Sequence, residues 1–306
     1  MGAGALAGDG SAMSERVATL IASPQGHALT PMLAERACEA VGSRHLYWLA
    51  DGIACDIPLP EGTADAHSPL RDALGEAPID VVVQPADGRR KRLLIADMDS
   101  TMIEQECIDE LAAEVGRKEE VAAVTAAAMR GEIDFEDALR ERVATLKGLP
   151  VSVIDKVIDE RITLRSGGRE LLATMRRSGA HTMLVSGGFT AFTSVIAARL
   201  GFHEHRANEL LVEDGALTGT VAEPILGQQA KLEALNEAVN RLGLDASETL
   251  AVGDGANDLA MIEASGIGVA LHAKPAVAAR AAARIDHGDL TALLYIQGYR
   301  DSDVAR

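Results

Sequence analysis

The first part of the chain, residues 16–85, alternates short apolar runs with amphipathic stretches. An apolar run at 17–21 predicts a strand, and the spacing over about 29–41 predicts a helix. Strands are predicted at 45–50, 53–57 and 79–83, and a second helix at 69–74. The resulting order, β-α-β-β-α-β, is typical at this length of an α+β unit with its helices on one face of an antiparallel sheet. An Asp51-Gly52 pair fits a hairpin turn between the middle strands.

A different pattern begins at Leu93. Short, continuous apolar runs, at 93–96, 182–185, 250–252 and 268–271, alternate with long helical stretches. This alternation is typical of a parallel sheet covered by helices on both faces. A helical segment at 107–164 separates the first two runs, and we expect it to form a cap. The sequence thus predicts a doubly wound α/β core at 86–106 and 165–306, a cap at 107–164, a module at 16–85 and a flexible leader at 1–15.

The composition excludes several classes of partner. Lys and Arg number 29 against 46 Asp and Glu, so the 306 residues carry a formal net charge of −17. This negative charge argues against nucleic acid or an anionic membrane as a partner, because both are polyanions. No run approaches the roughly 18 apolar residues that a membrane span needs. Cys38, Cys55 and Cys107 have neither disulfide-framework nor zinc-site spacing, so we expect reduced thiols and a cytoplasmic protein.

A basic cluster, Arg89-Arg90-Lys91-Arg92, precedes the first core strand. Such a run can form a nucleic-acid-binding patch. The acidic background and the lack of aromatic residues within the run favour instead a solvated segment that leads into the strand.

Polar clusters follow three of the predicted parallel strands. They are Asp97-Met98-Asp99-Ser100-Thr101, Ser186-Gly187-Gly188 and Gly253-Asp254-Gly255-Ala256-Asn257-Asp258. Ligands of open α/β sheets bind beyond the carboxyl ends of the strands, so we expect these clusters to form one site. Carboxylates without His or Cys favour Mg²⁺, while glycine amides and a hydroxyl suit an anion. Together with Lys231 on the next helical stretch, they predict a phosphoryl-transfer centre.

Other motifs do not fit the spacing. A calcium-binding EF loop that began at Asp97 would need glycine and glutamate where the chain has Met102 and Ile108. The sequence also contains no P-loop, no dinucleotide-binding glycine motif after a strand, no HExxH and no GxSxG. Phosphoryl transfer is therefore the chemistry that the motifs favour.

The ordered motifs, in the forms DxDST, VSGGF and GDGANDLAM, resemble those of the haloacid-dehalogenase superfamily and in particular of its phosphoserine phosphatases. The resemblance covers about residues 93–294. It implies that Asp97 is the nucleophile that forms an aspartyl-phosphate, and that Asp99 is the general acid and base, which requires a pKa near the working pH. It further implies Mg²⁺ ligands (Asp97, the Asp99 carbonyl, Asp254), phosphate-binding groups (Ser186, the Gly187 amide, Lys231), Asp258 to orient Lys231 or a metal-bound water, and the substrate-binding residue Asn257 to complete that loop.

The same resemblance implies that the cap selects the substrate. Glu106 would bind a substrate ammonium group, and Arg142 would bind a substrate carboxylate as a bidentate partner. Met129 and Phe135 would be apolar contacts that exclude water. Taken from the residues alone, Glu and Arg on an acidic helical bundle also fit a solvated network of i,i+4 ion pairs, and Arg140 is the rival to Arg142.

The implied function is Mg²⁺-dependent hydrolysis of O-phospho-L-serine to L-serine and phosphate, the last step of serine biosynthesis. Two alternatives remain open. One is an enzyme of the same fold that hydrolyses another small phosphate monoester or transfers the phosphoryl group to an alcohol such as homoserine. The other is an amino-acid-binding regulatory protein, because the module at 16–85 resembles ACT-type modules in its order of elements. Packing, or contact in a homodimer, is an equally good role for that module.

Overall fold

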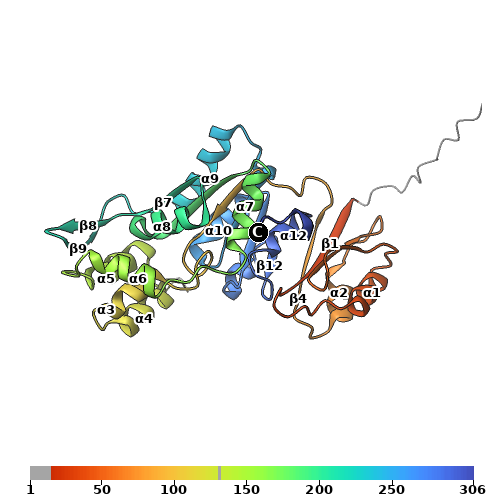
Figure 1. Ribbon diagram of the computed structural model, residues 1–306, viewed down its shortest axis with the longest axis horizontal. Coiled ribbons are helices and arrows are strands. Elements are labelled where there is room, and N and C mark those ends of the chain that lie inside the picture. Colours follow the sequence, from red (N-terminus) through yellow and green to blue (C-terminus); the bar gives the residue numbers. More distant parts are fainter. Residues whose placement is uncertain (1–14, 130–131) are drawn as a thin grey trace, which may run out of the picture.

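The chain is described by a computed structural model that places residues 15–129 and 132–306. The predicted leader therefore lies outside the described residues, except for its last position. Figure 1 shows a central α/β core with an N-terminal module on one side and a helical cap on the other. Among the described residues, the helices are all too short or too polar to cross a membrane.

The N-terminal module has the predicted β-α-β-β-α-β order. Its elements are β1 (Arg16–Ala22), α1 (Pro31–Ala40), β2 (Tyr47–Ala50), β3 (Ala54–Pro58), α2 (His67–Leu74) and β4 (Ile79–Pro85). The sheet is antiparallel, in the order β2-β3-β1-β4. The α+β prediction is confirmed, whereas an ACT-type role for the module stays a prediction.

Every residue of β1 after Arg16 is buried, because both faces of this sheet are covered. Side chains alternate between the faces of a strand. Ala18 and Leu20 pack in the cluster formed with the two helices, whereas Ile21 belongs to the cluster shared with the core. The module is therefore held between its own helices and the core.

The core is built on a six-stranded parallel sheet, as the alternating apolar runs predict. Its order is β12-β11-β10-β5-β6-β7. The strands are β5 (Leu93–Ala96), β6 (His181–Phe189), β7 (Glu204–Asn208), β10 (Thr249–Gly253), β11 (Ile267–Leu271) and β12 (Ala283–Ile285). The accompanying helices are α7 (Gly168–Arg177), α8 (Thr190–Leu200), α9 (Gln228–Leu242), α10 (Leu259–Ala264), α11 (Pro275–Ala278) and α12 (Ala292–Ile296).

The cap lies between β5 and β6 in sequence. Its helices are α3 (Cys107–Glu114), α4 (Lys118–Met129), α5 (Phe135–Ala144) and α6 (Ser152–Glu160). A hairpin of β8 (Leu210–Glu213) and β9 (Ala216–Val221), which the apolar pattern does not predict, lies beside α5 (Figure 1). The Gly148 amide donates to the Leu217 carbonyl at 2.8 Å, so this hairpin packs on the cap although it lies within the segment predicted to be core.

The prediction that the basic cluster is solvated is wrong for two of its residues. Arg89 Nη1 forms an ion pair with Asp56 Oδ2 at 2.6 Å, and both side chains are 11% exposed. Arg89 Nε also donates to the Ile296 carbonyl at 3.0 Å. Lys91 is buried as well, and its ammonium donates to the Gly88 and Ser247 carbonyls. The Arg89 pair joins the linker to the module, and the Lys91 bond to Ser247 joins the linker to a distant segment of the core. Sequence composition reveals neither contact.

A second contact fixes the module through β4, a strand at the edge of its sheet. The Asp80 carboxylate on β4 accepts hydrogen bonds from the main-chain amides of Asp286, His287 and Gly288, at 2.8 to 3.3 Å. Asp80 is 1% exposed, so its carboxylate is stabilised by hydrogen bonds from core amides and not by water. The module and the core are thereby joined by buried polar groups at two places.

Candidate active site

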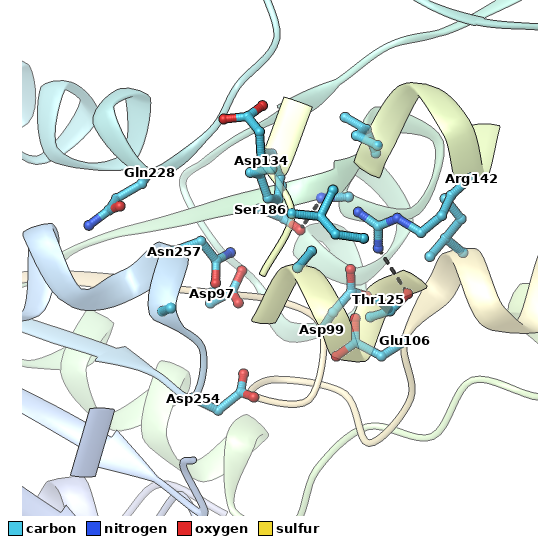
Figure 2. A pocket seen from close by; sticks show the side chains of 18 of the residues that line it. Asp97, Asp99, Glu106, Thr125, Asp134, Arg142, Ser186, Gln228, Asp254 and Asn257 are labelled. Atoms are coloured by element: carbon cyan, nitrogen blue, oxygen red, sulfur yellow. Dashed lines mark hydrogen bonds between the residues drawn. The ribbon is translucent and has the colours of Figure 1, made fainter. Parts of the chain in front are cut away.

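The carboxyl ends of β5, β6 and β10 meet at a cavity of about 420 Å³ beneath the cap. Figure 2 shows acidic side chains from the core on its floor and Arg142 from α5 at its cap side. The lining residues that carry chemistry come from all the predicted motifs: Asp97, Asp99, Glu106, Arg142, Ser186, Gly187, Gly188, Asp254 and Asn257. The three polar clusters thus form one site, and cap residues complete it.

Asp97 stands directly after β5 and is 5% exposed. Lys231 Nζ on α9 lies 2.7 Å from Asp97 Oδ1, as an ion pair outside the direction of a hydrogen bond. Among the described residues, no group other than Lys231 is placed to donate to that oxygen. Burial raises the pKa of Asp97 well above its usual range, and the charge of Asp258 adds to the rise while Lys231 opposes it. The site therefore favours a cation beside Asp97.

Asp258 lies beneath the cavity and organises the groups around it. Its Oδ1 accepts a hydrogen bond from Lys231 Nζ at 2.6 Å, and its Oδ2 accepts from the Asp254 and Gly255 amides at 3.1 and 3.0 Å. A Cβ at Gly253 would lie 2.3 Å from Asp258 Cγ, so only glycine permits this approach. Burial opposes the charge of Lys231, but the carboxylates of Asp258 and Asp97 outweigh it and raise the lysine pKa.

The carboxylates of Asp97, Asp254 and Asp258 suit a hard divalent cation. Their ligand oxygens all lie within 4.8 Å of one another. Asp254 accepts hydrogen bonds from the Thr101 hydroxyl at 3.2 Å and from Lys274 Nζ at 3.1 Å. Its pKa is raised, first by burial and then by the charge of Asp258. A cluster of buried carboxylate oxygens fits a metal such as Mg²⁺.

Asp99 lies in the same loop, and its carboxylate lines the cavity. Its Oδ1 accepts from the Cys107 amide at 3.3 Å, at the start of α3. Burial raises the pKa of Asp99 to about 6, although the Cys107 hydrogen bond opposes the rise. A carboxyl group with such a pKa can both donate and accept a proton near neutral pH, as the general acid and base requires.

The Ser186-Gly187-Gly188 segment forms the end of β6 and faces Asp99. The Ser186 hydroxyl accepts a hydrogen bond from the Gly188 amide at 2.9 Å. A Cβ at Gly188 would lie 2.7 Å from Asp99 Oδ2, and one at Gly187 would lie 2.9 Å from the Phe135 ring. Glycine at both positions therefore keeps the space between the catalytic loop and the cap open for a ligand.

Glu106 enters the cavity at the start of α3. Its Oε1 accepts a hydrogen bond from the Ser100 hydroxyl at 2.7 Å. Burial raises the pKa of Glu106 to about 8, and the charges of Asp99 and Asp254 contribute to the rise. A ligand ammonium group would relieve this unfavourable environment, because it would supply the missing positive charge.

The two candidate arginines of the cap occupy different environments. Arg142 is buried and lines the cavity, and its Nη1 donates to the Thr125 hydroxyl at 3.0 Å (Figure 2). Burial lowers the pKa of Arg142, while the charge of Glu106 raises it. Arg140 points to the surface, where it forms ion pairs with Glu136, Asp137 and Glu223. The solvated network expected as the alternative exists, and it belongs to Arg140.

The other predicted substrate-binding residues have mixed outcomes. Phe135 and Asn257 both line the cavity. Met129 is the last residue of α4, and its side chain lies outside the described part of the chain. Thr125, Lys274 and Gln228 contact the site or line it without having been predicted. Thr125 precedes Met129 by four residues in the sequence, a spacing that could have indicated it.

A family model for haloacid dehalogenase-like hydrolases matches residues 94–263, which is more than half of the chain. Among curated proteins, the phosphoserine phosphatase SerB2 of Mycobacterium tuberculosis is 40% identical over 259 residues, which are 83% of this chain and 62% of that protein. This chain spans less than two thirds of the length of several curated relatives that it matches.

Solved structures support the same relationship. A probable phosphoserine phosphatase from Vibrio cholerae, in unliganded form, has a TM-score of 0.74 and 33% identity, and the match covers 93% of this chain and 86% of that one. A substrate-bound phosphoserine phosphatase complex has a TM-score of 0.64 and 39% identity, with 67% and 98% covered. The resemblance inferred from the motifs is thus confirmed, and the chain belongs to the haloacid dehalogenase-like hydrolases.

Proposed function

We propose that this chain hydrolyses O-phospho-L-serine to L-serine and phosphate. The observation that carries the proposal is the placement of Glu106 and Arg142 in the cavity that also contains Asp97 and Asp99. The names of the relatives described above agree with it. Glu106 and Arg142 match the ammonium and carboxylate groups of phosphoserine, and the phosphoryl-transfer centre matches its phosphate.

Recognition of the substrate rests on Arg142 and Glu106, two charged side chains that form no ion pair with another described residue. Arg142 donates to Thr125 Oγ1 and the Ala138 carbonyl, both uncharged, and it has no carboxylate partner among the residues described. A substrate carboxylate would complete it, since guanidinium and carboxylate pair in a bidentate manner. Glu106 would take the ammonium group, and the Phe135 ring would cover the phosphate end beside Gly187.

The first chemical step transfers the phosphoryl group to the enzyme. An Asp97 carboxylate oxygen attacks phosphorus, and the bond from phosphorus to the serine oxygen breaks. Asp99 gives its proton to the departing serine oxygen. Ser186, the Gly187 amide and Lys231 would bind the phosphate oxygens, on which charge resides in the transition state.

The second step releases phosphate and restores the enzyme. A water oxygen attacks the phosphorus of the aspartyl-phosphate, and the bond to Asp97 breaks. Asp99 takes the proton of that water and so returns to its protonated form. Asp97, the Asp99 carbonyl and Asp254 would hold Mg²⁺, which supplies the positive charge that lets a phosphate dianion approach several aspartates. Without a divalent metal we expect the ester to bind barely at all.

A panel of esters tests the proposal. Phosphate release is measured with and without Mg²⁺ for O-phospho-L-serine, for phosphoethanolamine, which lacks the carboxylate, and for 3-phosphoglycerate, which has a hydroxyl in place of the ammonium group. We expect Arg142→Ala to raise the KM for phosphoserine by roughly a hundredfold and to leave the turnover of phosphoethanolamine unchanged. Arg140→Ala, which removes a surface arginine of the same helix, is the matched control.

The panel also separates the alternatives. Equal rates for all esters would contradict recognition of both ends of the amino acid. Transfer of the phosphoryl group to an added alcohol such as homoserine, in preference to water, would favour a phosphotransferase. Serine binding to the full chain without any turnover would favour a regulatory protein.

The location and the assembly are part of the proposal. We place the reaction in the cytoplasm, which agrees with three buried, unpaired cysteines. We further propose a homodimer through the N-terminal module, whose side chains Met32 and Tyr47 are 72% and 52% exposed although apolar. Light scattering on the full chain, compared with a Met32→Lys variant, measures this directly, and a monomer at all concentrations would exclude it.

A further inference from the structure

We infer that Arg165, which no motif includes, is a positioning residue for the active site. It lies in the segment that leads from α6 of the cap back to α7 of the core. Its side chain is half-buried and does not line the cavity. Any effect on the reaction must therefore pass through the residues that it holds.

Arg165 fixes the chain just after the catalytic aspartates. Its Nη2 donates to the Ser100 carbonyl at 2.7 Å, and its Nε donates to the Thr101 carbonyl at 3.0 Å. Its own amide donates to the Met102 carbonyl at 3.0 Å. Among the described residues, its guanidinium has no carboxylate partner, so its hydrogen bonds serve the main chain of this loop.

Each residue held by the guanidinium orients one functional carboxylate. The Ser100 hydroxyl donates to Glu106 Oε1 at 2.7 Å, and the Thr101 hydroxyl donates to Asp254 Oδ1 at 3.2 Å. One arginine thereby fixes both the carboxylate proposed to bind the substrate ammonium group and a carboxylate proposed to bind the metal. Removing it would loosen two carboxylates with different proposed roles in the same cavity.

The conformation of Ser100 shows why such support is needed. Its φ is 55°, in the left-handed region that residues other than glycine adopt rarely and at a cost in energy. The surrounding structure must hold a residue in this state. Arg165 donates to the carbonyl of Ser100, and the amide of Ser100 donates to the Gln105 carbonyl at 3.2 Å.

Arg165 also stands where the two connections between cap and core run side by side. Ile103 in the outgoing segment and Leu164 in the returning segment form an antiparallel bridge. The next residues of the two segments are also joined, because the Glu104 amide donates to the Thr163 carbonyl at 3.0 Å. The side chain of Arg165 therefore ties the returning connection to the catalytic loop itself.

The test compares Arg165→Met, Arg165→Lys and the control Arg169→Ala. Arg169 is an exposed arginine of α7 that also donates to a carbonyl, that of Arg199, at 3.1 Å and away from the loop. We expect Arg165→Met to lower kcat and to weaken Mg²⁺ binding by roughly tenfold each. Arg165→Lys, which can keep one of the two hydrogen bonds, should recover part of both losses. Arg169→Ala should change neither.

The readouts include Mg²⁺ titration by calorimetry, which needs no turnover, and the preference for phosphoserine over 3-phosphoglycerate. We expect Arg165→Met to reduce that preference, because Glu106 loses its orientation. Unchanged kcat, metal affinity and preference in a folded Arg165→Met protein would overturn the inference, as would equal losses in Arg165→Lys and Arg165→Met. The inference rests on the proposed function. If the wild type does not hydrolyse phosphoserine, that function fails, and calorimetry together with the best ester of the panel still tests Arg165.

Discussion

The core contacts the N-terminal module on one side and the cap on the other. Each of these two junctions contains a largely buried arginine, and the two arginines have different partners. Toward the N-terminal module, the Arg89 guanidinium meets the Asp56 carboxylate and main-chain carbonyls. Toward the cap, Arg142 donates to uncharged oxygens only, as far as the described residues go, and Glu106 has a hydroxyl donor from Ser100 but no cation against it. Both junctions bury arginine, yet only in the first does a carboxylate of the protein contact the guanidinium directly.

This difference distinguishes buried charges that stabilise the fold from buried charges that bind a ligand. A buried ion pair whose partners are both within the chain stabilises one arrangement, and removal of either partner is costly. A buried charge without a protein partner destabilises the empty site and is explained by the ligand that completes it. The degree to which a buried charge is matched is therefore more informative here than burial alone, and four variants examine it.

The largest effect is expected at the active site. Asp97→Asn removes the proposed nucleophile, so turnover of phosphoserine should fall by roughly 10³- to 10⁶-fold. The thermal midpoint of the metal-free protein should not fall, because burial and neighbouring acids disfavour the charge on Asp97. Steady-state rates and thermal unfolding measure the two outcomes. Turnover near that of the wild type would contradict the covalent route.

At the opposite junction we expect a loss of stability with no loss of chemistry. Arg89→Met leaves Asp56 buried without its cation, which should lower the free energy of unfolding by about 3–5 kcal/mol. The kcat of the folded fraction should stay unchanged, since the residue lies away from the cavity. Chemical denaturation of the full chain gives the stability.

The double variant Arg89→Met with Asp56→Asn is the control for this prediction. It removes both charges and leaves an oxygen that can still accept from the Thr19 hydroxyl, which donates to Asp56 at 2.7 Å. Most of the lost stability should return. A double variant as unstable as the single one would show that the charge pair itself stabilises the junction.

A smaller effect is expected where the cap holds its arginine. Thr125→Val keeps the shape of the side chain and removes the oxygen that accepts from Arg142 Nη1. We expect the KM for phosphoserine to rise by about tenfold, the size of one hydrogen bond to a charged group, with kcat nearly unchanged. Thr220→Val, on an exposed strand of the hairpin, is the control. A fall in kcat with constant KM would contradict this positioning role.

The local pattern of apolar and polar residues predicted most of the fold and most of the core residues that line the cavity. Asp97, Ser186 and Asp254 were predictable because each follows a continuous apolar run, and the ends of parallel strands share one edge. Strands β7 and β12 were not predictable in the same way. Strand β7 lies at the sheet edge and is rich in polar residues, and β12 has three residues. Strand β7 contains no buried apolar residue, and β12 is too short for its two buried apolar residues to form a recognisable pattern.

The residues that the sequence did not reveal depend on contacts between distant segments. Lys274 reaches Asp254 from the segment after β11, and Arg165 reaches Ser100 across the whole cap. The Arg89 and Asp56 pair joins a linker to β3. Nothing in the local spacing distinguishes these basic residues from solvated ones, since their contacts are with segments distant in the sequence.

The smallest effect is expected within the same basic cluster, at Arg92. This side chain is 62% exposed, and its Nη1 forms an ion pair with Glu248 at 2.9 Å. Exposed pairs of this kind contribute about 0–1 kcal/mol because water and salt screen them. Arg92→Ala should therefore change the free energy of unfolding by less than about 1 kcal/mol, and less still at high salt. A loss as large as that of Arg89→Met would mean that basic charge in general, and not the buried pairing of Arg89 with Asp56, attaches the module to the core.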